Sequence, residues 1–356
     1  MGEKIDQYMA LALQPVQVGA KERGDIGRNL DHIAELAFAA KNVTEIELPV
    51  KLYAIPEGAL QGFTDEIFDW DHVDMVRRLA IDLPGPETHY LSDMARGLDA
   101  FVVAQAKVTH PEFPERFFNC AFVIDPRGEI IHKHYKMQVF AREHTTLPHD
   151  VWDKWVELYG EGLDAFFPVT DTEIGRIGCI ICMEGSYPET TRGLAMNGAE
   201  IVYRPSYPEP YVGNGLWEVQ NRARALDNTM YMICPNPAGY APTAESAYPL
   251  DMFGGESMIV DYQGRVIGTH KAGGGASYAG AIINIEALRE YRTRSLWGNW
   301  IKDLRTEQYR LIYDQPIYEK NRAMDKPPVK HAEHDEFLRG NIELLIERGV
   351  YRPPSD

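Results

Sequence analysis

The sequence predicts a layered α/β sandwich, and three observations support this fold class. Short apolar strands alternate with helical stretches along most of the chain. Pairs of strands, several of them hairpins, separate the helices, which favours stacked layers over one purely parallel sheet. The 356 residues are 44% hydrophobic and 25% charged. A chain of this length and composition can bury a large core, as one large domain or two smaller ones.

The N-terminal part alternates strand and helix. The apolar segment 8–17 predicts a strand, and 24–42 repeats its apolar residues at helical spacing. A second strand is expected over 50–60, where Pro56 stops it. The segment 85–98 opens with a proline near its first turn, which is typical of a helix start.

The middle of the chain continues the same order. A strand over 99–109 is followed by a hairpin over 117–137, with "DPRG" as its turn. The segment 175–182 is then expected to be a strand, and 188–199 a helix that Gly198 closes.

The last layered elements are the strand "EIVYRPS", a helix over 216–228, the strand "YMICPN", the hairpin "GESMIVDYQGRVIGTHKA" and the strand "YAGAIINI". After about residue 286 the pattern breaks down into a polar segment with scattered aromatic residues. We therefore expect one domain over 1–285 and a C-terminal extension over 286–356 that packs on a partner subunit.

Composition excludes several classes of partner. The formal net charge of −17 opposes binding to a nucleic-acid backbone. No apolar run approaches the roughly 18–20 residues of a membrane span, and the first residues lack a signal-peptide pattern, so we expect no membrane partner and a cytoplasmic location. The four cysteines are too few for a disulfide framework, and we expect reduced thiols.

Two of these cysteines, Cys179 and Cys182, form a C-x-x-C motif. A zinc site needs two further ligands at matching spacing, and none appears nearby; on a strand the two thiols would point to opposite faces, which disfavours a redox pair. Cys179 lies among apolar residues, as a core cysteine does. Cys182 ends the strand and leads into a helix, where nearby N–H groups can stabilise a thiolate and an oxyanion.

A cysteine nucleophile needs a base and a donor for the oxyanion. The 11 histidines are scattered and offer no convincing Cys-His arrangement. Glu57 follows Pro56 at the end of an apolar run, and Lys136 follows a strand, with Glu143 seven residues further on. Taken alone, Glu57 is equally typical of a charge in a loop, and a lysine at the place of Lys136 is usually a solvated end cap.

The order of Glu57, Lys136 and Cys182 along the chain, however, resembles that of the nitrilase superfamily of carbon–nitrogen hydrolases, whose triad is Glu, Lys and Cys. The matching elements are "IPE" with Glu57, the eight-residue step from Gly128 to Lys136 in "GEIIHKHYK", and "ICMEGSYPETTRGLAMNGAEI" with Cys182. Softer matches are "ALALQ", "NCAFVIDPRG", "NRARALDNTMYMICPNPAG" and "GGESMIVDYQGRVI". The resemblance covers about residues 8–285.

The resemblance implies a four-layer αββα sandwich, with 1–285 as the catalytic domain. It implies that Glu57 is the general base, and that Lys136 and the backbone N–H of Met183 hold the oxyanion. Glu143 corresponds to a second glutamate that orients substrate or steadies the lysine; its other interpretation is a solvated loop acid. The implied course runs through a thioester on Cys182 and requires no metal or organic cofactor.

The branch within the superfamily depends on smaller features. Nitrile-cleaving members carry C-W-E, whereas this chain has C-M-E, which favours an amide substrate. The match to "ICxxGxYPExxR" and the long C-terminal segment resemble the aliphatic amidase and formamidase branch. The alternatives are a nitrilase, an N-carbamoyl hydrolase, an acyl transferase or a catalytically silent binding subunit. Members pair through the helix after the nucleophile, so a homodimer or a larger even-numbered assembly is expected.

Overall fold

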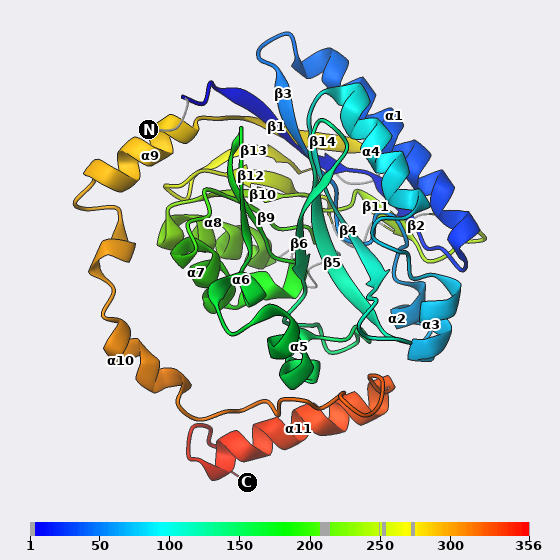
Figure 1. Ribbon diagram of the computed structural model, residues 1–356, viewed down its shortest axis with the longest axis vertical. Coiled ribbons are helices and arrows are strands. Elements are labelled where there is room, and N and C mark those ends of the chain that lie inside the picture. Colours follow the sequence, from blue (N-terminus) through cyan, green and yellow to red (C-terminus); the bar gives the residue numbers. More distant parts are fainter. Residues whose placement is uncertain (1–3, 207–213, 249, 251–253, 272–274, 356) are drawn as a thin grey trace.

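Two six-stranded sheets face each other in the computed structural model (Figure 1). The first sheet has the order Ser277–Ile283 (β14), Tyr8–Gln14 (β1), Val50–Ala54 (β3), Phe101–Thr109 (β4), Phe117–Ile124 (β5) and Ile130–Tyr135 (β6). The second has the order Val266–His270 (β13), Ser257–Val260 (β12), Tyr231–Cys234 (β10), Ile201–Tyr203 (β9), Gly175–Cys179 (β8) and Val169–Thr172 (β7). The structure describes residues 4–206, 214–248, 250, 254–271 and 275–355.

Both sheets follow one plan. Strands β1, β3 and β4 run parallel in the first sheet, as do β8, β9 and β10 in the second. Antiparallel strands extend each parallel set on both sides. A small parallel pair, Val16–Val18 (β2) with Gly239–Ala241 (β11), lies apart from them. Parallel neighbours need a crossover helix, which explains why helices separate the strands in the sequence.

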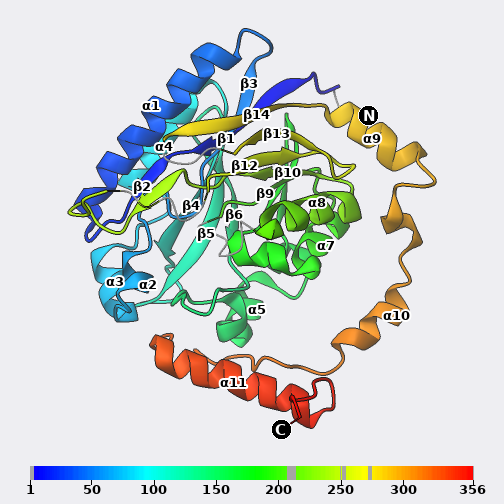
Figure 2. The same ribbon diagram turned by 180° about the vertical axis from the view of Figure 1, so that it is seen from behind.

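Helices cover the two outer faces (Figures 1 and 2). Ile26–Thr44 (α1) and Pro86–Leu98 (α4) lie on the first sheet, and Pro188–Met196 (α7) and Leu216–Asn228 (α8) lie on the second. The alternation of side chains fills three apolar layers. In and just after β8, for example, Ile177 and Cys179 enter the core between the sheets, while Ile180 packs with the residues of the outer helical layer. The predicted αββα sandwich is therefore confirmed.

Several strands end earlier in the structure than the sequence predicts. The strand expected over 50–60 ends at Ala54, and the strand expected over 175–182 ends at Cys179. Short elements that lack enough residues to show a period were not predicted: Thr64–Ile67 (α2), His72–Arg78 (α3), Trp152–Tyr159 (α5), Leu163–Phe166 (α6) and β7. The structure also has five 3-10 turns among its described residues: Arg23–Asp25 (η1), Pro148–Val151 (η2), Cys182–Ser186 (η3), Trp300–Asp303 (η5) and Leu311–Tyr313 (η6).

The C-terminal segment is more ordered than its sequence pattern indicates. Ile285–Arg294 (α9) starts at the predicted boundary and buries Ile285 and Leu288 in the core between the sheets. From α9 to Thr306–Arg310 (α10) the chain arcs past the side of the molecule that carries α7 and α8, and His331–Glu347 (α11) lies along the end near α5 (Figures 1 and 2). Packing on a partner subunit stays a prediction. Among the described residues, no helix has the length and apolar character of a membrane span.

Candidate active site

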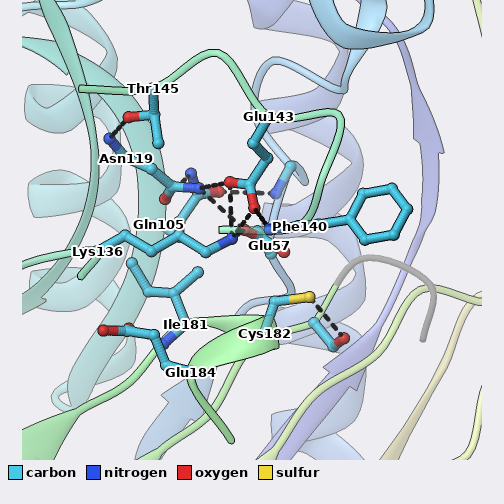
Figure 3. A network of polar contacts seen from close by, with 12 residues as sticks. Glu57, Gln105, Asn119, Lys136, Phe140, Glu143, Thr145, Ile181, Cys182 and Glu184 are labelled. Carbon is cyan, nitrogen blue, oxygen red and sulfur yellow. Dashed lines mark hydrogen bonds and ion pairs between the residues drawn. The ribbon is translucent and has the colours of Figure 1, made fainter. Parts of the chain in front are cut away.

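Three charged side chains singled out in the sequence meet at the ends of β3 and β6. Lys136 Nζ donates to Glu57 Oε1 at 2.9 Å and to both carboxylate oxygens of Glu143 at 2.7 Å (Figure 3). Glu57 follows β3 by three residues because Pro56 cannot continue the ladder. Lys136 directly follows β6, and its backbone N–H donates to the Asn119 carbonyl at 2.9 Å. The C-terminal ends of β3 and β6 lie at the same edge of the first sheet, with β4 and β5 between them, and bring together residues that lie 79 positions apart.

This cluster is removed from water. Glu57 and Lys136 are each 1% exposed, and Glu143 is 8% exposed. Burial alone would lower the pKa of Lys136, but the neighbouring Glu143 and Glu57 outweigh it and raise that pKa well above its usual value. Burial raises the pKa of Glu143, against the effect of Lys136 and together with that of Glu57. Lys136, whose ammonium lies between two carboxylates, therefore stays charged. Glu143 binds a proton more readily than an ordinary glutamate does.

Asn119 orients both carboxylates, and the sequence analysis did not single it out. Its Nδ2 donates to Glu57 Oε1 at 2.9 Å and to Glu143 Oε1 at 3.3 Å. Its Oδ1 accepts from Gln105 at 2.7 Å, and Gln105 in turn accepts from the Gly58 N–H at 2.7 Å. The motif "NCAFVIDPRG" contained the residue, but nothing local in the sequence indicates what its side chain contacts.

Cys182 occupies a sharp turn. It follows β8 by three residues, begins η3, and has a φ of +47°, a left-handed conformation that costs energy for a residue with a Cβ. Its backbone N–H donates to the Pro205 carbonyl at 2.8 Å, and the buried Arg204 donates to its carbonyl through Nε at 3.2 Å and Nη2 at 3.1 Å. Strain held by such contacts is common at functional sites.

The thiol faces the charged cluster. Figure 3 draws Cys182 on the side of Glu57 and Lys136, and its charge is a further cause of the raised pKa of Lys136, after Glu143 and Glu57. The Ser206 hydroxyl donates to Sγ at 3.5 Å. Met183 is the second residue of η3, and the first N–H groups of a helical turn have no partner inside it. The predicted thiol, base, ammonium and backbone donor thus belong to one place in the fold.

Glu184 connects the cysteine turn to the lysine strand. This carboxylate is fully buried and accepts from the Ile181 N–H at 2.6 Å. It also accepts from the Met137 N–H at 2.9 Å and lies 2.9 Å from His134 Nε2. The residues around Cys182 and Lys136 are therefore anchored to one another across the two sheets. Glu184 lies in the motif around Cys182, but nothing local in the sequence indicates which groups its side chain contacts.

The other cysteines have a different environment. Burial raises the pKa of Cys179 well above its usual value and that of Cys120 and Cys234 to about 12, so these thiols stay protonated. Cys179 is part of the core between the sheets, as predicted. Among the described residues, the one group with the donor types and spacing of a metal site consists of Asp69, His144 and His331, without either cysteine of the C-x-x-C motif.

Comparison with known proteins agrees with this architecture. The family model for carbon–nitrogen hydrolases matches residues 12–292. The chain is 28% identical over 243 residues to a formamidase of Bacillus cereus (strain Q1), an alignment that covers 67% of this chain and 65% of that protein. The chain thus spans somewhat less than two thirds of the length of this curated relative.

Two solved structures share the fold. One is Nit3 of Saccharomyces cerevisiae, a member of branch 10 of the nitrilase superfamily, with a TM-score of 0.63, 22% identity, and coverage of 83% of this chain and 97% of that one. The other is a variant of the amidase from Nesterenkonia sp. AN1, with the acetamide moiety of fluoroacetamide covalently added at its active-site cysteine. Its TM-score is 0.61 at 18% identity, covering 86% of this chain and 97% of that one.

Proposed function

Because the chain belongs to the carbon–nitrogen hydrolase family, we propose that it is an amidase that hydrolyses a small carboxamide to the carboxylic acid and ammonia or an amine. One observation carries the proposal: the buried Glu57–Lys136–Glu143 cluster lies beside a cysteine held in a strained turn. This arrangement supplies a nucleophile, a base and a fixed positive charge in a site with little water. The formamidase relative favours a small acyl group.

The proposed reaction begins when Cys182 Sγ attacks the amide carbonyl while Glu57 accepts the thiol proton. The negative charge that develops on the carbonyl oxygen is held by Lys136 Nζ and the Met183 N–H. Glu57 returns the proton to the leaving nitrogen, the C–N bond breaks, and a thioester remains on Cys182. Water, deprotonated by Glu57, then attacks the thioester, releases the acid and regenerates the thiol.

Glu143 has a different proposed task from Glu57. Both of its oxygens contact Lys136 Nζ at 2.7 Å, and one also accepts the Phe140 N–H at 2.9 Å. A carboxylate held at several points is suited to fixing the position of the ammonium. Glu57 makes one contact of 2.9 Å with the ammonium, through Oε1. We therefore assign proton transfer to Glu57 and the positioning of Lys136 to Glu143.

The test of this function is ammonia release from formamide, acetamide, propionamide, a benzamide, an N-carbamoyl amino acid and the matching nitriles. An amide is expected to exceed its matching nitrile in kcat/KM by about 10²-fold or more, or roughly 2.7 kcal/mol. An amide develops an oxyanion that Lys136 and the Met183 N–H can hold, whereas a nitrile gives a thioimidate nitrogen that needs protonation. Met183 also stands where nitrile-cleaving relatives carry Trp.

Four outcomes would contradict the assignment in different ways. A better rate with the nitrile would replace the amidase by a nitrilase, and a preference for the N-carbamoyl compound would indicate the carbamoyl hydrolases. Acyl transfer to hydroxylamine at the expense of hydrolysis would indicate a transferase. A folded chain that turns over none of these compounds, with an unreactive Cys182 thiol, would be a silent binding subunit.

The C-terminal extension supports a proposal about assembly. Its described residues include large apolar side chains that are strongly exposed, among them Leu296 at 86%, Trp297 at 88% and Leu311 at 72%. Exposed apolar surface of this kind is typical of interaction sites. We propose that this segment packs on a partner subunit in a homodimer or a larger even-numbered assembly.

The double variant Trp297→Ser, Leu311→Ser is therefore expected to sediment as smaller species than the native protein, because the partner contacts lose apolar area. A deletion from residue 286 would remove α9, which packs in the core, so point changes give the cleaner test. Ile46→Ser is the matched control, since Ile46 is 82% exposed but lies elsewhere, after α1. An unchanged mass distribution in the double variant would count against the proposed interface.

A further inference from the structure

Asp69, His144 and His331 come together from three separate segments. Asp69 lies between α2 and α3, His144 directly follows Glu143, and His331 is the first residue of α11. His144 Nε2 lies 3.2 Å from Asp69 Oδ1, and His331 Nδ1 lies 3.7 Å from the same oxygen. One possible ligand atom from each residue falls within 4.8 Å of the other two. This group is separate from the Glu57–Lys136–Glu143 cluster and has no part in the proposed reaction.

One nitrogen of the buried His144 ring is of particular interest. His144 is 4% exposed, and its Nε2 makes no hydrogen bond of acceptable geometry among the described residues, despite the nearby Asp69 oxygen. A buried polar atom without a hydrogen bond is costly, and such atoms can mark an ion that binds there. In a metal site the lone pairs point at the shared ion rather than at one another, so close ligand atoms without hydrogen bonds between the rings and the carboxylate are expected.

The orientation of His331 fits the same interpretation. Its Nε2 lies 3.0 Å from the Arg142 carbonyl oxygen. Because a carbonyl only accepts, this contact requires a proton on Nε2 and, in the neutral ring, leaves the lone pair on Nδ1, the nitrogen nearest Asp69. Metal-binding histidines commonly donate their other N–H in this way.

We propose that Asp69, His144 and His331 bind one divalent transition-metal ion of the Zn²⁺ type, which fastens the start of α11 to the loop that carries Glu143. Tetrahedral zinc with bonds of about 2.0–2.2 Å to nitrogen and oxygen holds its ligand atoms roughly 3.3 Å apart. The separations of 3.2 and 3.7 Å are close to this value. The Asp69 side chain is 37% exposed and that of His331 18%, which leaves room for water as a fourth ligand.

The fastening would matter because little apolar burial holds α11. No residue of this helix is fully buried. Its polar anchors include a hydrogen bond from Lys330 Nζ to the Asp69 carbonyl and the pairing of Arg142 with Asp335 at 3.0 Å, and its Phe337 packs on Tyr318 with the ring centroids 4.8 Å apart. A cavity of about 390 Å³ lies between this part of the chain and the loop, and Glu143, His334 and Phe337 are among its lining residues. The ion would fix one wall of the space behind Glu143.

The test is Zn²⁺ binding to the full chain, measured by competition with a chromophoric chelator. All proteins carry Cys182→Ala, so that the active-site thiol cannot take the metal. The host is expected to bind one Zn²⁺ per chain, and His331→Ala to bind at least about 100-fold more weakly. His334→Ala, one turn along the same helix and outside the group, is the matched control and should bind like the host. Circular dichroism checks that each variant is folded.

Two further measurements complete the design. Co²⁺ in the same site should give visible absorption bands without a thiolate-to-cobalt band, as nitrogen and oxygen ligands do. Zn²⁺ should also slow tryptic cleavage after Lys330 in the host and in His334→Ala, but not in His331→Ala. The proposal is overturned if the host binds no stoichiometric Zn²⁺, if His331→Ala binds as well as His334→Ala, or if cleavage is unchanged by Zn²⁺. These readouts do not involve amide turnover, so either proposal can fail without the other.

Discussion

Cys182→Ala is expected to abolish amide turnover, with a loss on the order of 10⁶-fold, because no other group can form the thioester. The loss should come from the reaction and not from folding. Cys182 is only partly buried, and alanine meets the same backbone strain at a φ of +47° that cysteine does. Initial rates of ammonia release measure the loss. Acid quench and intact-mass analysis of the unaltered enzyme should reveal an acyl group on Cys182, which hydroxylamine intercepts as a hydroxamate.

Cys179→Ala is the matched control, three residues earlier in the chain. Cys179 is fully buried between the sheets, and its raised pKa keeps it protonated. This variant should retain turnover and lose roughly 1 kcal/mol of unfolding free energy through the small cavity it creates. Normal turnover in Cys182→Ala, or an acyl group on any other residue, would contradict the covalent mechanism.

The sequence predicted which charged residues meet because their motifs fix where each strand ends. Glu57 behind its proline, Lys136 behind a hairpin strand and Cys182 ahead of a helix all mark the ends of strands. Glu57 and Lys136 follow strands of the first sheet and Cys182 follows a strand of the second, so their meeting was predicted from local signals together with the family resemblance. The turn at Cys182 was less predictable. The pattern extended β8 to that residue, whereas the strand ends at Cys179 and the chain bends into η3.

The residues that position the catalytic side chains could not be identified from local sequence patterns. Asn119 contacts Glu57 across 62 positions of sequence, and Glu184 contacts His134 across 50. Whether the side chain of Asn119 or Glu184 contacts a distant residue depends on how the strands and sheets are arranged in space. The pattern of apolar residues around each of them does not contain that information. His331 is a similar case, because its segment reads as a polar tail and its neighbours Asp69 and His144 come from far earlier in the chain.

Helix α11 was missed for a related reason. A helix is recognised by an apolar stripe, and this one buries no residue fully. In contrast, α8 was predicted over 216–228 with the bounds that the structure has, because Trp217 and Ala225 face the outer apolar layer. Sequence periodicity thus predicted most of the strands and the long helices of the outer layers. It did not predict α11, which buries no residue fully.

Lys136→Met is the second change with a large expected effect, and it separates catalysis from stability. The lysine provides the charge that the oxyanion needs, and loss of one oxyanion donor alone costs about 10²–10³-fold in other enzymes. Because a full positive charge is lost here, kcat/KM should fall by about 10³-fold or more. The variant also leaves Glu57 and Glu143 buried without their cation, which should cost about 3–5 kcal/mol of unfolding free energy.

The unfolding free energy lost in Lys136→Met should depend on pH, and the direction of this dependence can be predicted. Glu143 already has a raised pKa in the folded protein, and removal of Lys136 should raise it further. A carboxyl group whose folded pKa exceeds its unfolded value favours the folded state below the unfolded pKa, and this contribution is lost as the pH rises through the folded pKa. The stability gap between Lys136→Met and the native protein should therefore shrink as the pH falls from neutral, as urea unfolding at several pH values can measure.

Lys107→Met is the matched control for Lys136→Met. Lys107 is also 1% exposed, and its Nζ contacts two carboxylates, Asp65 at 2.6 Å and Glu66 at 2.7 Å. Lys107→Met should lose a similar amount of unfolding free energy, since it strands two buried carboxylates in the same way, yet the folded fraction should turn over amide within about tenfold of the native rate. If both variants lost turnover equally per folded molecule, the effect of Lys136 would be structural. If Lys136→Met kept its turnover, the oxyanion would have to be held by other groups, and the role proposed for this lysine would be wrong.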